Sequence, residues 1–260
     1  MDVHSLGYRT DLALLQLGGS LVADRGTHLV VRTPANPSFY WGNYLLLATP
    51  PDPGSGEFWL EQFERELPEA RHRAFGVDGT TGTKEDLAVF AEVGLQVDAS
   101  SVMTASTVHE PPHPHPTAVV RPLTSDADWH EHVALAVAGE DERYSEDFAT
   151  ARAAAHRRNI EAGHGRWFGA FLEGRLMASL GIFTASAGLA RFQEVKTHPD
   201  ARGQGLAGTL VHAASRHAFD EMGARTLVMV ADPDYLAIRV YRSVGFDDTE
   251  TQLGADRAPG

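Results

Sequence analysis

Three glycines within six residues are the first feature of the sequence with a possible chemical role. The segment "EVKTHPDARGQGLAGTLVHAASRHAF" (194–219) passes from an apolar run, through a break at 197–200, to Gly203, Gly205 and Gly208, and then into a helical pattern. This order predicts a strand, a tight loop and a helix start. Glycines let backbone N–H groups converge without Cβ interference, and a helix N-terminus adds positive potential. The loop is therefore a candidate site for an anion, above all a phosphate.

The common nucleotide fingerprints do not fit this loop. No lysine follows the glycines as it does in a P-loop. Dinucleotide-binding glycines follow an early strand of their domain, whereas the strand before this loop comes late. The loop therefore indicates a phosphate-bearing ligand other than ATP or NAD.

The elements that position the loop can be read from periodicity in residues 117–260. Ser125 or Asp126 can cap a first helix, and Glu173-Gly174 between two apolar runs predicts a hairpin. The pattern predicts, in chain order, a strand at 117–122, helices through 129–137 and 148–160, the hairpin within 166–183, a strand at 189–197, a helix with the apolar stripe Leu206, Leu210, Ala214 and Ala218, a strand at 226–230, a helix at about 235–244 and a closing strand. This order predicts an α/β fold with a mixed sheet.

Two motifs in this range carry a family resemblance. Arg202-x-x-Gly205-x-Ala207 after "VKTHPDA" resembles the Q/R-x-x-G-x-G/A signature of the GCN5-related N-acetyltransferases (GNAT). "DYLAIRVYRSVGF" (234–246) resembles the N-x-x-A-x-x-L-Y-x-x-x-G-F element of the same family, at the expected distance. The resemblance covers residues 117 to about 253, beginning at "VVRPLTSDADW", and implies the fold of an acyl-CoA N-acyltransferase.

The resemblance implies acetyl-CoA as the co-substrate. Amides from Gly203 to Gly208 would hold the pyrophosphate, and the backbone of 195–197 would pair with the pantetheine arm like an added strand. Asp234 stands where the family has an asparagine, and a carboxylate cannot donate as an amide does. The implied cofactor-binding residues are Val195, Lys196, Thr197, Arg202, Gly203, Gln204, Gly205, Leu206, Ala207, Gly208 and Asp234.

Acetyl transfer to an amine needs a base for the amine and an acid for the departing thiolate. Tyr241 stands where the family keeps its general acid; alternatively it is an aromatic packed in the core. Glu194, on the strand leading into the loop, is the best candidate for the base, against the alternative of a salt-bridged carboxylate. His198 and a water relay remain further possibilities for the base.

The first half of the chain resembles a degenerate copy of the second. "AVFAEVGLQVD" (88–98) aligns with "RVYRSVGFDDT" (239–249), which places Phe90 opposite Tyr241. "ATPPDPGSGEFWLEQF" takes the position of the glycine loop, but prolines and acids replace the signature. We therefore expect two GNAT-like domains in tandem, 1–108 and 117–260, joined by a Pro/His linker at 109–116. Because the first loop is a poor anion site, we expect one acetyl-CoA per chain.

The segment "PSFYWGNYLLL" is predicted to be a strand of the degenerate copy. Its Phe39, Tyr40 and Trp41 would either fill the core or face an acceptor pocket between the halves. The core is the more usual place for large aromatic side chains.

Composition limits the classes of partner. The chain of 260 residues has no cysteine, a formal charge of −13 and 43% hydrophobic residues. This acidity argues against nucleic-acid binding and favours cationic small molecules. The absence of thiols suits the cytoplasm, and neither an export signal nor a membrane-spanning run is visible. His109, His113 and His115 alternate with prolines, which splays their rings, so we expect no metal site.

The sequence thus predicts an N-acetyltransferase acting on a primary amine of a small acceptor. The alternative is a non-catalytic CoA-binding or scaffolding protein of the same fold. Aminoacyl transfer from tRNA, a third possibility, is disfavoured by the charge. No motif identifies the acceptor, whose pocket we expect at 138–158 and in the first half, and we expect a monomer or homodimer.

Overall fold

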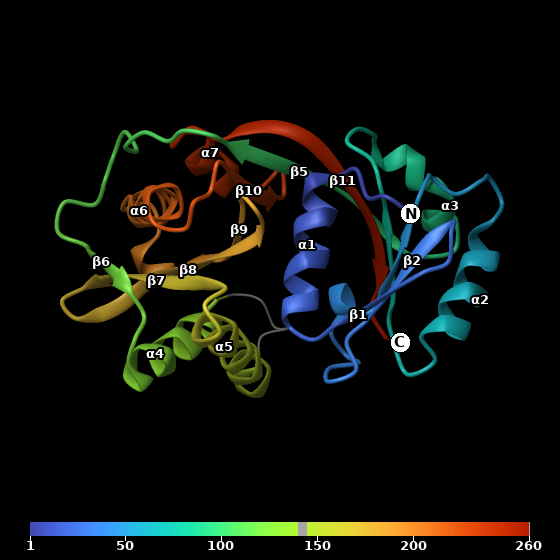
Figure 1. Cartoon of the computed structure of the whole chain (residues 1–260), viewed down its shortest axis with the longest axis horizontal. Coiled ribbons are helices and arrows are strands. Elements are labelled where there is room, and N and C mark those ends of the chain that lie inside the picture. Colours follow the sequence, from blue (N-terminus) through green and yellow to red (C-terminus); the bar gives the residue numbers. More distant parts are fainter. Residues whose placement is uncertain (140–144, 260) are drawn as a thin grey trace. The chain divides into compact units, whose positions relative to one another are not determined.

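The computed structural model describes residues 1–139 and 145–259, which form two compact units (Figure 1). Unit 1 comprises Met1–Met103, Val230–Tyr235 and Asp248–Gly260, and unit 2 comprises Thr104–Met229 and Leu236–Asp247. None of the helices in the described ranges is long and apolar enough to cross a membrane.

Unit 2 has the element order that the sequence predicts, except that the closing strand belongs to unit 1. Its elements are β6 (Val119–Pro122), α4 (Asp126–Val137), α5 (Glu146–Glu161), β7 (Gly165–Leu172), β8 (Arg175–Ser186), β9 (Leu189–Thr197), the 3-10 turn η3 (Pro199–Ala201), α6 (Leu206–Asp220), β10 (Thr226–Ala231) and α7 (Ala237–Arg242). The strands lie in the order β10-β9-β8-β7-β6. The β9–β10 pair is parallel and the others are antiparallel, so the predicted mixed sheet is confirmed.

Local sequence signals explain several of these elements. The β7–β8 hairpin turns at Glu173 and Gly174, both with positive φ (49° and 83°), between the paired residues Leu172 and Arg175. Two such residues form the turn whose twist suits a hairpin. The predicted α6 stripe is buried along its whole length.

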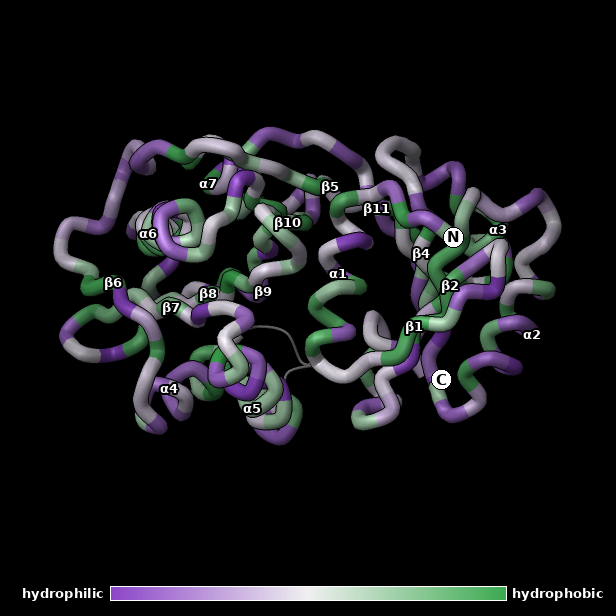
Figure 2. The backbone as a smooth tube through the Cα atoms, in the orientation of Figure 1, coloured by the Kyte–Doolittle hydropathy of each residue, from purple (hydrophilic) through white to green (hydrophobic). Residues whose placement is uncertain are grey.

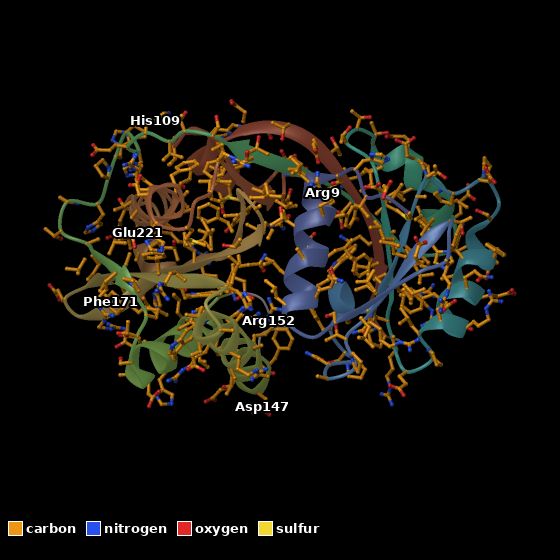
Figure 3. The ribbon with its side chains drawn as sticks, viewed as in Figure 1. Arg9, His109, Asp147, Arg152, Phe171 and Glu221 are labelled. Carbon is orange, nitrogen blue, oxygen red and sulfur yellow. The ribbon has the colours of Figure 1, made fainter. Side chains whose placement is uncertain are left out.

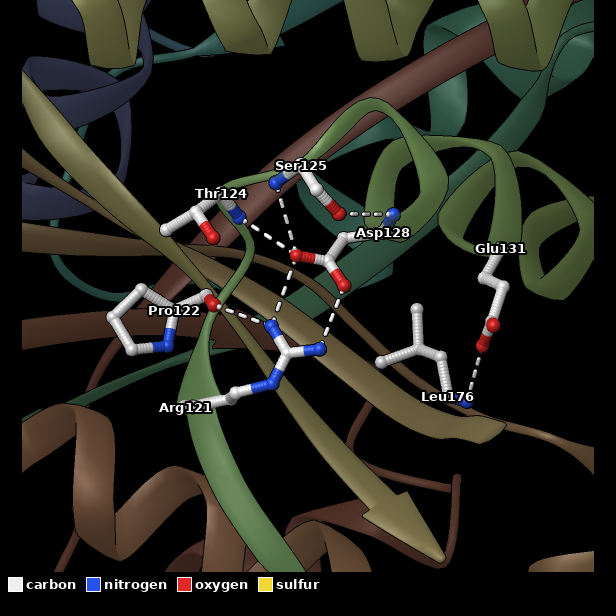
Figure 4. A network of polar contacts seen from close by, with 7 residues as sticks. All are labelled: Arg121, Pro122, Thr124, Ser125, Asp128, Glu131 and Leu176. Atoms are coloured by element: carbon white, nitrogen blue, oxygen red, sulfur yellow. Dashed lines mark hydrogen bonds and ion pairs between the residues drawn. The ribbon is translucent and has the colours of Figure 1, made fainter. Parts of the chain in front are cut away.

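The start of α4 is fixed by a network of polar contacts (Figure 4). Ser125 is the N-cap: its Oγ accepts from the Asp128 N–H at 3.1 Å, and Asp128 accepts from the Ser125 N–H at 3.1 Å. Arg121 of β6 donates two hydrogen bonds to the Asp128 carboxylate, at 2.9 and 2.7 Å. The Arg121 hydrogen bond holds the pKa of Asp128 far below its usual value, although burial opposes the shift. This capping box ties the first strand of the unit to its first helix.

Unit 1 also alternates helices and strands. Its elements are α1 (Leu6–Leu17), β1 (Leu21–Asp24), β2 (His28–Arg32), η1 (Tyr40–Gly42), β3 (Tyr44–Leu47), α2 (Gly56–Glu66), β4 (Arg73–Val77), η2 (Lys84–Leu87), α3 (Ala88–Glu92), β5 (Gln96–Ala105) and β11 (Asp247–Arg257). The strands lie in the order β1-β2-β3-β4-β11-β5. Apolar and polar stretches follow one another along α1, which buries Tyr8 and Leu12 (Figure 2).

The last strand of the chain belongs to the sheet of unit 1. β11 pairs antiparallel with β4 from Leu253↔Val77 to Arg257↔Arg73. Leu253 and Ala255 are buried in a core cluster that includes Phe75. The compact units therefore differ from the predicted ranges, because the alternating apolar residues of β11 fill the core of unit 1, and because residues 109–116 lie within unit 2.

The predicted strand through Phe39, Tyr40 and Trp41 is wrong. These residues form the turn η1 and its approach, and the strand β3 begins only at Tyr44. The carbonyls of Phe39 and Tyr40 accept from the N–H groups of Gly42 (3.1 Å) and Asn43 (3.0 Å), which closes the turn. Trp41 packs beside Tyr44 with ring centroids 5.6 Å apart, against the core of unit 1.

Candidate active site

The glycine loop of unit 2 joins β9 to α6. Gly203 (φ 75°) and Gly205 (φ 83°) both adopt the left-handed conformation, and Gly205 is the N-cap of α6. Non-glycine residues rarely adopt this conformation, so the predicted need for glycine is confirmed at these two positions. A Cβ at Gly203 would meet open space, so the side of the loop at this residue is open.

The amides of this loop are not consumed by the fold. In the part of the chain that the structure describes, no backbone carbonyl accepts a hydrogen bond from the N–H groups of 203–208. Gly205 offers no side-chain cap, and the first turn of the 15-residue helix α6 holds no acidic residue. Free amides and the helix dipole make this an electropositive anion site.

Side-chain and backbone hydrogen bonds stabilise the start of the loop. The Gln204 side-chain amide donates to the Asp200 carbonyl at 3.0 Å, and the Arg202 N–H donates to the Pro199 carbonyl at 3.2 Å. His198 accepts from the Asp200 N–H at 3.3 Å and so caps η3. This capping contact gives His198 a structural role.

The predicted linker lies against the same helix, and we call residues 109–116 the strap. The His109 N–H donates to the Val244 carbonyl at 3.0 Å, and the His115 N–H donates to Thr209 Oγ1 at 2.8 Å. Pro111 is buried against Gly208, and a Cβ at Gly205 would collide with the carbonyl oxygen of His113. The strap therefore packs along the start of α6. Among the described residues, no group of three or more His, Cys, Asp or Glu side chains could hold a metal ion.

The strands β9 and β10 pair only over a short length. Their register runs from Leu189↔Thr226 to Arg191↔Val228, whereas β8 stays paired with β9 as far as Thr197. Within the described ranges, Lys196 and Thr197 pair with β8 and lie beyond Arg191, the last residue of β9 that pairs with β10. An extended amide chain can add to such an edge by main-chain hydrogen bonds.

Glu194 lies at a β-bulge in β9. The register shifts from Gly181↔Gln193 to Ser179↔Lys196, so β9 carries one extra residue, and Glu194 has a φ of 49°. Such bulges re-aim side chains and are over-represented next to active sites. At this bulge, Glu194 accepts hydrogen bonds from two residues of α5, Arg152 and His156. Arg152 is labelled in Figure 3.

Charge and burial set the ionisation of Glu194. Burial favours the neutral acid, but the hydrogen bond from His156 and the charges of Arg152 and Lys196 outweigh it and hold the pKa of Glu194 well below its usual value. Glu194 is therefore a carboxylate at neutral pH, in the salt-bridged state that the sequence leaves open.

Tyr241 is buried on the short helix α7, with 6% of its surface exposed. It lies in unit 2, as do the glycine loop and Glu194. Asp234 lies in 230–235, which clusters with unit 1, and its N–H donates to Asp232 Oδ1 at 2.8 Å. The structure thus places every predicted site residue except Asp234 in one unit.

Arg152 and His156 are absent from the sequence-based site. They stand four residues apart on α5, and this spacing places two side chains on one helix face. The spacing could have indicated a paired polar face, but not its partner on β9. They fall in the predicted acceptor segment 138–158, of which residues 140–144 lie outside the described residues.

The glycine loop, the β9 strand edge beyond its pairing with β10, and the buried Tyr241 all belong to unit 2. The sequence profile of the Acetyltransferase (GNAT) family matches residues 128–246. The chain therefore carries a domain of the GNAT superfamily, a family of acyltransferases, and the predicted family resemblance is confirmed.

Solved structures support the fold over nearly the whole chain. A GCN5-related N-acetyltransferase from Kribbella flavida is 16% identical, with 98% of each chain covered and a TM-score of 0.67. A functionally unknown conserved protein from Staphylococcus epidermidis is 12% identical, covers 92% of this chain and 93% of its own, and has a TM-score of 0.71. A tandem GNAT protein from the clavulanic acid biosynthesis pathway is 15% identical, covers 95% and 88%, and has a TM-score of 0.56. No curated protein matches the sequence.

Proposed function

We propose that unit 2 transfers an acetyl group from acetyl-CoA to a primary amine of a small acceptor. The observation that carries this proposal is the loop at 203–208, where amides without backbone acceptors in the described chain converge at a helix N-terminus. The loop suits the pyrophosphate of CoA. The edge of β9 at 195–197 suits the amides of the pantetheine arm.

The reaction needs one residue to accept a proton and another to donate one. The neutral amine nitrogen attacks the thioester carbonyl carbon, and the C–S bond breaks as the new C–N bond is completed. Glu194 takes the proton that the nitrogen loses, directly or through water, and Tyr241 gives a proton to the departing thiolate. A bound amine nitrogen becomes strongly acidic once it carries the acyl carbon, so a carboxylate of low pKa suffices as the base.

Unit 1 is proposed to be a degenerate copy of the same fold. From α1 to β5, its helices and strands follow the order α-β-β-β-α-β-α-β, and the run from α5 to β11 repeats that order. The β3–β4 pair is parallel, as is the β9–β10 pair that occupies the same place in the order. We propose that unit 1 binds no CoA and that the chain acts in the cytoplasm as a monomer or homodimer.

A non-catalytic CoA-binding protein is the second candidate. The observation in its favour is the pairing of Glu194 with Arg152 and His156, which lowers its basicity. Release of free thiol from acetyl-CoA separates the two candidates, because a scaffold binds the thioester without consuming it.

The test is an acceptor screen with thiol release as the readout. The formal charge of −13 favours cationic acceptors, so polyamines and aminoglycosides are compared with amino acids and simple amines. We expect acceptor-dependent thiol release with one of the amine classes. Tight CoA binding without thiol release for any amine would instead support the scaffold.

A further inference from the structure

The contacts of Glu194 distinguish its two carboxylate oxygens. Oε1 accepts from Arg152 Nε at 3.1 Å, from Arg152 Nη2, and from His156 Nε2 at 3.2 Å. Oε2 lies 3.7 Å from Lys196 Nζ and accepts no hydrogen bond from residues 1–139 or 145–259. One oxygen is thus held by α5 while the other keeps its lone pairs.

The geometry of His156 fixes its role in this contact. A carboxylate can only accept, so Nε2 carries the hydrogen and the neutral ring has the Nε2–H tautomer. The ring lies on Trp167 with centroids 4.5 Å apart, and the side chain is buried. Trp167 is fully buried, so the ring plane of His156 is set by packing as well as by the hydrogen bond.

The surroundings keep His156 neutral. Burial lowers its pKa, and the charges of Arg152 and Lys196 act in the same direction, whereas Glu194 raises it. His132 of α4, whose pKa burial lowers to about 4, contacts the same Trp167 ring at 4.8 Å. Above a pH of about 6.5, the ordinary value for histidine, His156 is therefore a neutral donor.

We infer that His156 is a positioning residue for the base: its Nε2–H, together with Arg152, holds Oε1 of Glu194 and leaves Oε2 to take the proton of the acceptor amine. This inference rests on the proposed function. The proton leaves the amine nitrogen for Oε2 as the C–N bond forms, and the carboxylic acid returns it to solvent before the next turnover. A glutamate side chain has three rotatable bonds, so fixing one oxygen limits the directions that the other can take.

Two substitutions of nearly equal polarity test this role. In His156→Gln, the side-chain amide nitrogen can occupy the position of Nε2 and donate to Oε1. In His156→Asn, the amide nitrogen reaches only the position of Nδ1 and cannot. We expect His156→Asn to lower kcat by about 10- to 100-fold, since misplacing a catalytic group by about 1 Å can cost 10²-fold, and His156→Gln to stay within about threefold of the wild type.

A control separates positioning from packing. His132→Gln changes a buried histidine that lies on the same ring but pairs with Ser179 Oγ at 3.1 Å instead of Glu194. We expect His132→Gln to retain kcat and all three variants to retain CoA affinity. The acid limb of kcat/KM in His156→Gln should match the wild type, because the titrating base is Glu194 in both.

Two outcomes would overturn the inference in a protein whose wild type binds CoA and turns over. If His156→Gln is as slow as His156→Asn, the imidazole itself takes the proton; if His132→Gln loses as much as His156→Asn, the loss reflects core packing. Should the variants not fold, ¹⁵N shifts of the wild-type ring decide: we expect the Nε2–H tautomer, and an Nδ1–H tautomer overturns the inference. Failure of the wild type to bind CoA or release thiol counts against the proposed function itself, and the inference falls with it.

Discussion

The chain contains two turns that lead from a strand into a helix, each after the third strand of its run of elements. The two turns differ in whether their backbone N–H groups are used in hydrogen bonds. Between β3 and α2, the Ser55 N–H donates to the Asp52 carbonyl at 3.1 Å, and Pro51 and Pro53 have no N–H to donate. Between β9 and α6, the amides of 203–208 have no backbone acceptor among the described residues. The first helix also has Glu57 in its first turn, whereas the second has no acid there.

The difference shows that the order of elements does not by itself make an anion site. Both turns contain a glycine in the left-handed conformation, Gly54 in the first and Gly205 in the second, so the backbone changes direction in a similar way in both. What distinguishes them is the number of amides left for a ligand and the sign of the nearby charge. Substitutions that give the second turn the residues or the charge of the first should therefore weaken its function.

The largest effect is expected at Tyr241, which aligns in sequence with Phe90 of the proposed degenerate copy. Tyr241→Phe gives unit 2 the residue of unit 1 and removes the proposed acid, so we expect turnover to fall by about 10²- to 10⁴-fold, at the low end because a thiolate is a fair leaving group. Steady-state rates with the acceptor from the screen measure the loss, and CoA affinity should not change. Unchanged turnover would remove Tyr241 from the mechanism.

A smaller effect is expected from an acid placed in the second turn. Gly203→Asp adds a carboxylate where a side chain meets open space, and Gly203→Asn adds the same shape without charge. Asn and Asp tolerate the left-handed conformation better than other residues, so the strain is matched. We expect Asp to weaken CoA binding at least about tenfold more than Asn, because its charge opposes the diphosphate and the helix dipole. Equal affinities in calorimetry would mean that the phosphates bind elsewhere.

The smallest effect concerns folding stability. Gly54→Ala and Gly205→Ala impose the same left-handed strain of about 1–2 kcal/mol, but only at Gly205 would the new Cβ collide, with the His113 carbonyl of the strap. We expect Gly205→Ala to lower the free energy of unfolding by at least about 1 kcal/mol more than Gly54→Ala, as overpacking does. Denaturant titration measures both, and equal losses would show that the strap does not pack on the loop.

Features governed by neighbouring residues could be predicted from the sequence. The Glu173-Gly174 turn, the Ser125 cap and the glycine loop each depend on residue types within a few positions. The place of Glu194 on a strand before the loop was equally readable.

Features governed by distant pairing could not be predicted. A closing strand is expected after the helix at 235–244, but nothing local shows that it pairs with β4, whose Val77 lies 176 residues before its partner Leu253. The bulge that turns Glu194 onto Arg152 and His156 arises from the β8–β9 register, and the strap looks like an ordinary proline-rich spacer until its contacts with α6 are seen.

Calorimetric titration of the intact chain with CoA measures how many of the two turns bind the coenzyme. We expect one site per chain, weakened by Gly203→Asp and unaffected by Asp52→Asn in the first turn. Two sites of comparable affinity, or a single site that keeps its full affinity in Gly203→Asp, would contradict the assignment of the coenzyme to the β9–α6 turn.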